Sequence, residues 1–409
     1  MLKYSDRKKY GVILKRILLL IFIFLISVLQ ILTTADAAAV TYGPCEVIND
    51  YSHVKISVNS SFYDDYLPAS AGMRDNITEY KDGFYRLGFG GWIAAENVAL
   101  IPERKLLVNR ILSAGMINKG KTTEIRFAVT ENVPVDAKCK DGVFYITLFN
   151  TPDFAADITL TDNPVFKTAE GSLNREKKTA AYTFDLIDSD NFYGFELVYA
   201  GGFIIVKVRN PMSKTEGNLP LKDLTVIVDA GHGGADPGAL GFIKGKDEKD
   251  LSLSLALAVR AKLTELGADV VMTREKDETV DIYKRMDLLN KTNPDLAVSI
   301  HYNSVEKSEA SSSVKGFEAL YTNDAGRLLA KISSNSITSE LNKVRRATKY
   351  QALAVCRNHK FPAALLEMAF ITNPDEYEFA LSEDGVLSSA EAIANGIIAW
   401  IDAQQKWVN

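Results

Sequence analysis

The stretch Leu224-Thr-Val-Ile-Val-Asp-Ala-Gly-His-Gly-Gly-Ala-Asp-Pro-Gly238 decides the fold of the C-terminal part of the chain. Residues 224–228 are apolar or β-branched, a pattern that predicts a strand buried on both faces. The strand then runs into a loop in which glycines surround His232. Glycine permits positive φ and close approach of the backbone to a ligand. His232 is therefore a candidate functional residue.

Strands and helices alternate on the C-terminal side of this stretch. Buried runs at Asp269–Met272, residues 296–300 and residues 363–366 predict three further strands. Residues 250–266 predict a helix, although their opening Leu-Ser-Leu-Ser-Leu-Ala also fits the period of a strand. The length of the run favours a helix, and Gly267 follows where a C-terminal cap belongs. Residues 221–409 are thus expected to form an α/β domain with a mostly parallel sheet flanked by helices.

Three other residues that could bind a metal or move a proton lie near the ends of these elements. His301 directly follows the strand at 296–300, Glu367 follows the strand at 363–366, and Glu248 lies at the start of the long helix, just before residues 250–266. Ligand sites in open α/β sheets lie at the carboxyl ends of the strands, so these side chains are expected to converge with His232.

Histidine content supports this interpretation. A single histidine at a strand end is most often a hydrogen-bonded structural residue. This chain has four histidines, and two of them, His232 and His301, end buried strands. His53 and His359 lie in ordinary polar contexts and are interpreted as structural or surface residues.

These segments resemble the zinc-dependent N-acetylmuramoyl-L-alanine amidases of the amidase 3 family. The matching stretches, in the family's order, are Val226-Ile-Val-Asp-Ala-Gly-His-Gly-Gly, Glu248-Lys-Asp-Leu, Thr273-Arg274, Arg285, Ser299-Ile-His-Tyr-Asn303, Gly316-Phe-Glu318 and Leu366-Glu-Met-Ala-Phe-Ile-Thr-Asn373. Ala230 stands where the family often has Pro, and Met368-Ala369 where Leu-Gly is frequent. None of these is a ligand position.

The resemblance implies an activity and roles for the four residues. Zn²⁺ would be held by His232, Glu248 and His301, with a fourth position open to water. Glu367 matches the catalytic glutamate, which takes a proton from water and returns it to the leaving nitrogen of L-alanine. The substrate would be the muramyl-peptide of peptidoglycan, cut between N-acetylmuramic acid and L-alanine.

The resemblance and the residues together leave two alternatives open. The metal ligands alone do not exclude a zinc peptidase that cuts within the stem peptide, and a wall-binding protein with a catalytically silent amidase domain would keep the fold. The intact set of ligands and glutamate argues against the silent protein. Arg274 and Arg285 are interpreted as structural, because Arg often ties down loops by hydrogen bonds.

The N-terminal half predicts one or two small all-β modules. In residues 113–211, apolar residues alternate with polar ones, and Asp141-Gly142 and Gly201-Gly202 are hairpin-turn signals. A weak repeat relates residues 123–150 to 180–210, and such a pair could form one antiparallel sandwich.

This region loosely resembles the AMIN domains that precede some amidases, and residues 40–112 faintly resemble an SH3-type wall-binding module. Residues 212–220 are polar, with prolines at the flanks, and predict a linker.

Residues 1–39 predict a signal peptide or an anchor. A basic start precedes the apolar run at 17–32, and Ala35-Asp36-Ala37 fits the preference of a signal peptidase. The protein is therefore expected to be exported and associated with the cell wall. It would contact a membrane only if this segment stayed uncleaved.

Composition bounds the remaining possibilities. The 409 residues carry a net charge of −5, which argues against a nucleic-acid surface. Cys45, Cys139 and Cys356 are far apart and form no CxxC pair, so they are interpreted as buried or incidental thiols. Residues 304–315 are polar and rich in serine, which predicts a short loop that leaves the site open. The oligomeric state does not follow from the sequence.

Overall fold

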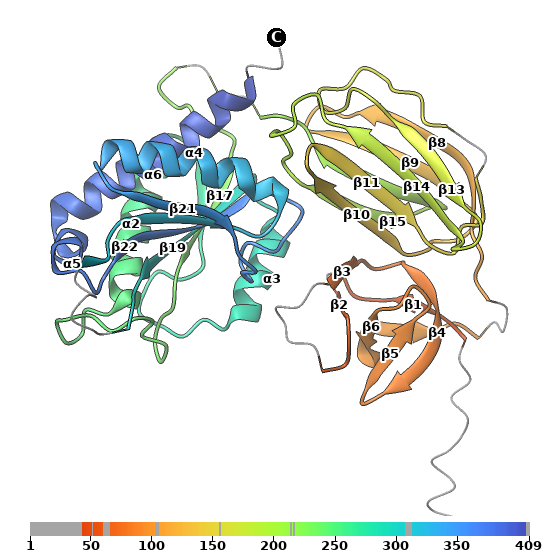
Figure 1. Cartoon of the computed structure of the whole chain (residues 1–409), viewed down its shortest axis with the longest axis horizontal. Coiled ribbons are helices and arrows are strands. Elements are labelled where there is room, and N and C mark those ends of the chain that lie inside the picture. The colour runs from red at the N-terminus through yellow and green to blue at the C-terminus, as the bar shows by residue number, and fades with distance from the viewer. Residues whose placement is uncertain are drawn as a thin grey trace, which may run out of the picture.

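The computed structural model describes residues 43–50, 52–59, 66–102, 106–154, 157–212, 215, 217–306 and 313–405. Three bodies are visible in Figure 1: a small β module, a β sandwich, and a sheet covered by helices. The predicted export signal at residues 1–39 lies outside the described residues, as do residues 307–312 of the loop that was expected to leave the site open.

The C-terminal body contains a six-stranded sheet in the order β18-β17-β19-β22-β20-β21. Four of its five strand pairings are parallel, and only β20 and β22 pair antiparallel, so β20 and β21 run opposite to the other strands. Its strands are β17 (Thr225–Ala230), β18 (Asp269–Met272), β19 (Leu296–Asn303), β20 (Phe317–Tyr321), β21 (Arg345–Tyr350) and β22 (Ala363–Phe370).

Helices cover both faces of this sheet, which confirms the expected α/β architecture. The larger core lies between the sheet and α2, α4 and α6, and the smaller one lies under α3 and residues 353–361. The helices are α2 (Glu248–Glu265), α3 (Ile282–Thr292), α4 (Asp324–Glu340), α5 (Pro374–Leu381) and α6 (Glu383–Gln405). Among the described helices, α6 alone is apolar and long enough to cross a membrane. Its Ile393, Ile397 and Trp400 are fully buried in the larger core.

Local signals start and end these helices. Asp247 and Asp250 form a capping box at the start of α2, which satisfies backbone N–H groups that have no partner within the helix. Gly267, with φ of +99°, follows its last turn as predicted. The helix therefore spans Glu248–Glu265, close to the expected 250–266. The length of this run thus correctly predicted a helix, although its first residues also fitted the period of a strand.

The β sandwich packs a four-stranded sheet, β10-β11-β14-β13, against a five-stranded sheet, β12-β8-β9-β16-β15. Both sheets contribute to one core. The two halves of the predicted repeat interlock, because β9 pairs with β16 and β11 pairs with β14. The strands are β8 (Arg110–Asn118), β9 (Thr122–Val129), β10 (Val135–Lys140), β11 (Val143–Leu148), β12 (Asp153–Phe154), β13 (Glu170–Asn174), β14 (Thr179–Asp185), β15 (Phe195–Ala200) and β16 (Phe203–Arg209). Strand β8 crosses the boundary expected between residues 112 and 113.

The first module is a seven-stranded sheet in the order β3-β2-β6-β5-β4-β1-β7. Its strands are β1 (Pro44–Val47), β2 (Ser52–Lys55), β3 (Tyr66–Ala69), β4 (Arg74–Lys81), β5 (Phe84–Leu87), β6 (Trp92–Ala94) and β7 (Val98–Leu100), with a 3₁₀ turn at Ala95–Asn97. Trp92 is buried, while Phe84 and Tyr85 are half-buried.

All three cysteines of the chain are free, as expected.

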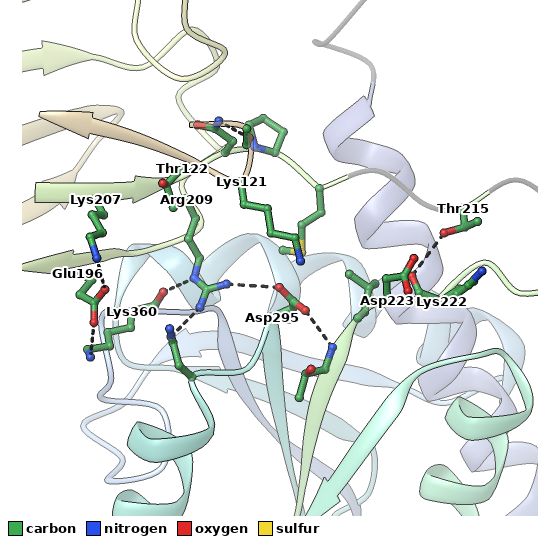
Figure 2. A pocket seen from close by; sticks show the side chains of 17 residues that line it. Lys121, Thr122, Glu196, Lys207, Arg209, Thr215, Lys222, Asp223, Asp295 and Lys360 are labelled. Carbon is green, nitrogen blue, oxygen red and sulfur yellow. Dashed lines mark hydrogen bonds and ion pairs between the residues drawn. The ribbon is translucent and has the colours of Figure 1, made fainter. Parts of the chain in front are cut away.

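The sandwich packs against the end of the six-stranded sheet where β17 and β19 begin. Figure 2 shows Arg209 of the sandwich reaching Asp295, which precedes β19. The same guanidinium donates to the side-chain oxygen of Asn293 at 2.8 Å and to the carbonyl of Lys360. These contacts border a cavity of about 520 Å³.

We predict that Gly194→Ala disturbs this docking. Gly194 has φ of +105°, and a Cβ there would lie 2.7 Å from the backbone of Lys360. Strain at such a φ alone costs about 1–3 kcal/mol, and the clash adds to it. Limited proteolysis should cleave the variant faster between the sandwich and the six-stranded sheet. Gly201→Ala is the matched control, because Gly201 also has a positive φ but a Cβ there would meet no atom within 4 Å. Equal cleavage of the two variants would contradict the prediction.

Candidate metal centre and active site

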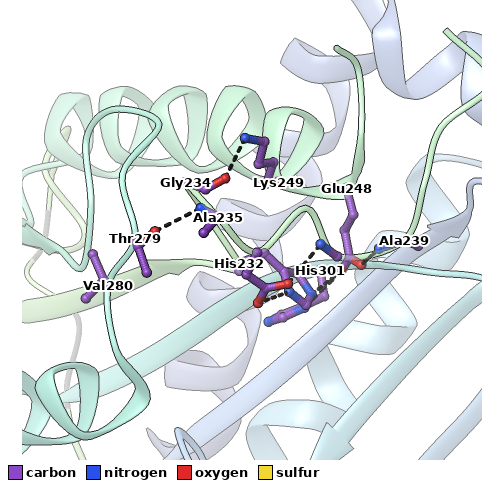
Figure 3. Close-up of polar contacts among 12 residues, drawn as sticks. His232, Gly234, Ala235, Ala239, Glu248, Lys249, Thr279, Val280 and His301 are labelled. Carbon is purple, nitrogen blue, oxygen red and sulfur yellow. Dashed lines mark hydrogen bonds and ion pairs between the residues drawn. The ribbon is translucent and has the colours of Figure 1, made fainter. Parts of the chain in front are cut away.

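His232, Glu248 and His301 come together at the carboxyl end of β17 and β19 (Figure 3). One carboxylate oxygen of Glu248 lies 3.1 Å from His232 Nε2 and 3.0 Å from His301 Nδ1. The three potential ligand atoms all lie within 4.8 Å of one another. The convergence expected from the strand ends is therefore present in the structure.

Backbone groups fix the carboxylate of Glu248. Its two oxygens accept hydrogen bonds from the N–H of Tyr302 at 3.1 Å and from the N–H of Ala239 at 2.9 Å. Glu248 is the first residue of α2 and is 5% exposed. A buried carboxylate held from both sides keeps one orientation, which suits a ligand better than a mobile surface group.

Two glycines leave room for this cluster. A Cβ at Gly231 would lie 2.5 Å from the ring of His301. A Cβ at Gly238 would lie 2.6 Å from the Glu248 carboxylate and 2.7 Å from the ring of His232. Any side chain at either position would displace a member of the cluster. Glycine is therefore required at both positions on steric grounds.

The electrostatics favour a cation at the centre of the cluster. Burial lowers the pKa of His232, but Glu248 and Asp236 outweigh burial and raise that pKa to about 9. Burial would raise the pKa of Glu248, yet the two imidazoles hold it far below its usual range. Asp236 contacts Nδ1 of His232 at 2.8 Å, so Nε2 faces Glu248. Carboxylates commonly orient metal-binding histidines in this way. Two imidazoles and one carboxylate fit the donor set of hydrolytic zinc sites.

Glu367 lies on β22, and its Cα is the register partner of His301 on β19. Burial raises the pKa of its carboxyl to about 7, and the nearby Glu248 and Glu318 add to the rise while the imidazoles oppose it. Within the described part of the chain, Glu367 Oε2 is buried and has no hydrogen-bond partner. A buried carboxylate oxygen without a partner is costly to the fold, which marks Glu367 as a candidate for a functional role.

Glu318 lies beside Glu367, and the sequence analysis did not single it out as a candidate site residue. It lies on β20 as the Cα partner of Glu367 and is 8% exposed. Its carboxylate contacts Lys349 at 3.1 Å and Arg346 at 3.6 Å, both on β21. The stretch Gly316-Phe-Glu318 was part of the family resemblance, but nothing in its local pattern indicated a carboxylate beside Glu367.

A cavity of about 340 Å³ opens beside the two histidines. Much of its wall is apolar, formed by Val280, Ile282, Leu353, Ala354, Val355 and Leu365.

The other two histidines lie elsewhere: His53 is on β2, and the ring centroid of His359 lies 4.5 Å from that of Phe195. Burial lowers the pKa of His359 to about 4, which favours a neutral structural residue, as expected.

Two buried arginines hold the loop that carries His232. Arg274 donates to the carbonyls of Ala230 at 3.0 Å and Gly231 at 2.7 Å. Arg285 donates to the carbonyl of His232, whose φ of +57° is unusual for a residue with a side chain. The structural role expected for both arginines is thus confirmed.

Asp229 anchors Arg285 beneath the site. Its carboxylate accepts from Arg285, from Thr273 at 2.7 Å and from Ser299. Burial would raise its pKa, but the charge of Arg285 and the hydrogen bond from Ser299 keep it below its usual range. Asp229 is thus a buried, ionised residue whose partners are all polar.

Comparison with known proteins places this C-terminal region among amidases. A family model described as N-acetylmuramoyl-L-alanine amidase matches residues 226–399. The germination-specific N-acetylmuramoyl-L-alanine amidase of Bacillus subtilis is 32% identical, over 43% of this chain and 81% of its own. The amidase LytC of Bacillus subtilis is 26% identical, and the match covers 67% of this chain and 54% of LytC. A solved N-acetylmuramoyl-L-alanine amidase from Clostridium difficile 630 is 30% identical, with a TM-score of 0.42, over 44% of this chain and 97% of its own.

We predict that Asp229→Ala destabilises the protein by about 3–5 kcal/mol, because it leaves the buried charge of Arg285 without its partner. The free energy of unfolding in denaturant measures the effect. Asp287→Ala is the matched control, since Asp287 pairs with Lys291 on the exposed side of α3, on the same helix as Arg285. Exposed pairs contribute about 0–1 kcal/mol. Equal losses in the two variants would show that the Asp229 network does not support the fold.

Proposed function

We propose a zinc-assisted mechanism for this chain on the premise that it belongs to the N-acetylmuramoyl-L-alanine amidases. The enzyme is a peptidoglycan hydrolase that cleaves the amide bond between N-acetylmuramic acid and L-alanine. The observation that best supports our mechanism is the placement of Glu367 next to His301, with His232 and Glu248 completing a three-donor cluster.

In this proposal, His232, Glu248 and His301 hold the Zn²⁺. When bound, zinc lowers the pKa of a coordinated water and polarises the amide carbonyl. Three protein donors leave a position open to water or substrate, as in other hydrolytic zinc sites. Asp236 keeps the His232 ring oriented through its contact with Nδ1.

Glu367 is the proposed general base and acid. Its buried Oε2 would accept the proton of the attacking water and then deliver it to the leaving nitrogen of L-alanine. The apolar wall of the cavity, including Val280 and Leu353, would pack against the small apolar groups on either side of the amide. Exclusion of water by such packing would strengthen the polar contacts of the reacting groups.

We further propose that the enzyme acts outside the cytoplasm, where peptidoglycan lies, and that the two β modules contribute to wall binding. The relatives named above support the first point through their substrate. An AMIN-like identity for residues 113–211 and an SH3-like identity for residues 40–112 remain proposals.

We predict that Glu248→Ala and His301→Ala abolish zinc binding and turnover, since two donors are too few for a stable site. Zinc content is measured after dialysis, and turnover is measured as release of stem peptides with a free N-terminal L-alanine from sacculi. Glu275→Ala is the control, because Glu275 is an exposed acidic residue that follows β18 and pairs with Arg260 of α2. Full zinc occupancy in His301→Ala would refute the ligand assignment. Cuts within the stem peptide would instead favour a peptidase.

We predict that Glu367→Gln keeps its zinc and its thermal stability but loses about 10²–10⁴ in rate, the range typical of a general base. The amide retains hydrogen bonding but cannot take up the proton. The same digestion assay measures the rate, with Glu275→Gln as the control for loss of an acidic charge. Near-native turnover by Glu367→Gln would mean that another group moves the proton.

A further inference from the structure

Two cations lie on the far side of Glu367 from the proposed metal centre. Lys349 and Arg346 belong to β21, the edge strand of the six-stranded sheet. Both contact the single carboxylate of Glu318, so the group carries one excess positive charge. The proposed mechanism assigns no role to either cation.

Glu318 anchors the cations without covering them. The Glu318 side chain is 11% exposed, whereas those of Lys349 and Arg346 are 49% and 40% exposed. Arg346 also lies 5.0 Å from the ring centroid of Phe370, the last residue of β22, and donates to the carbonyl of Lys315 at 3.4 Å. Two long side chains with solvent-facing charges are thus held in place from below.

This arrangement lies on the same face and edge of the sheet as the catalytic residues. His301, Glu367 and Glu318 are register partners on the adjacent strands β19, β22 and β20, and Glu318 is in turn the partner of Ala347 on β21. Adjacent strands are spaced about 4.8 Å apart, so the backbone of β21 lies roughly 10 Å from that of Glu367. An extended peptide covers this distance in about three residues, at about 3.3–3.6 Å per residue.

We propose that Arg346 and Lys349, positioned by Glu318, form a subsite for a free carboxylate on the stem peptide of the substrate. The inference rests on the proposed amidase function and adds a specificity determinant to it. With the scissile amide at the metal centre and the stem running across β22 and β20, the second or third residue of the stem reaches the cations. Arg346 supplies a planar donor pair that suits a carboxylate, and Lys349 supplies a second charge.

The test compares three soluble N-acetylmuramoyl-tripeptides. In the first, both the carboxylate of the second residue and the C-terminal carboxylate are free. Each of the other two carries one of these groups as the primary amide. Wild-type enzyme should favour the free substrate by about tenfold in kcat/KM over one of the amides, mainly through KM. The amide that reacts poorly identifies which carboxylate is bound. Added salt should reduce the preference, because both cations are exposed.

The double variant Arg346→Gln, Lys349→Gln provides the decisive comparison. It should lose the preference by weakening only the reaction of the free substrate, while kcat/KM for the disfavoured amide stays unchanged. A structural disturbance of Glu318 or Glu367 would slow all three substrates alike, and that result would overturn the subsite. Arg345→Gln is the matched control, because Arg345 lies on the same strand but contacts Asn335 of α4.

The outcomes separate this inference from the function on which it rests. Equal cleavage of all three substrates by the wild-type enzyme would overturn the carboxylate subsite and leave the amidase function intact. Cleavage of none of them would overturn the amidase function and the subsite together.

Discussion

The buried ion pair between Asp229 and Arg285 is the interaction on which the active site depends. Asp229 lies near the end of β17, and its carboxylate also binds Ser299 on β19 and Thr273 after β18, so one side chain joins three neighbouring strands beneath the site. Arg285 in turn donates a hydrogen bond to the carbonyl of His232. This contact stabilises the positive φ of His232, which a residue with a side chain rarely adopts. The backbone position of a proposed zinc ligand is thus supported by charges packed below it.

The two ends of the six-stranded sheet have different tasks. The carboxyl ends of β17, β19 and β22 carry the proposed zinc ligands and the proposed base, as expected for open α/β sheets. The opposite end receives the sandwich through Arg209 and Asp295. The sandwich therefore approaches the sheet from the end that carries none of the proposed catalytic residues.

The sequence predicted the parts of this structure that leave a local signature. Buried parallel strands are continuous apolar runs, and functional residues at their ends converge by topology alone, so the chain's pattern was enough to bring His232, Glu248, His301 and Glu367 together. Glu318 and its two cations could not be found in this way. Their proximity to Glu367 depends on the reversed direction of β20 and β21, and the exposed sequence Arg-Arg-Ala-Thr-Lys-Tyr has no pattern that reveals it. Docking of the sandwich was equally hidden, because it rests on single long-range pairs such as Arg209 with Asp295.

The interlocked strands of the sandwich impose an order on how the chain can fold. Strand β9 has β16 as a neighbour, about eighty residues later in the chain, and β11 pairs with β14 across another long separation. Neither half of the repeat can complete a sheet alone. During synthesis, β9 keeps an unpaired edge until β16, which ends at Arg209, has been synthesised. Such non-local pairing slows folding and exposes unpaired edges to other chains. A chain cut short before Phe203 would thus leave β9 as a site for aggregation.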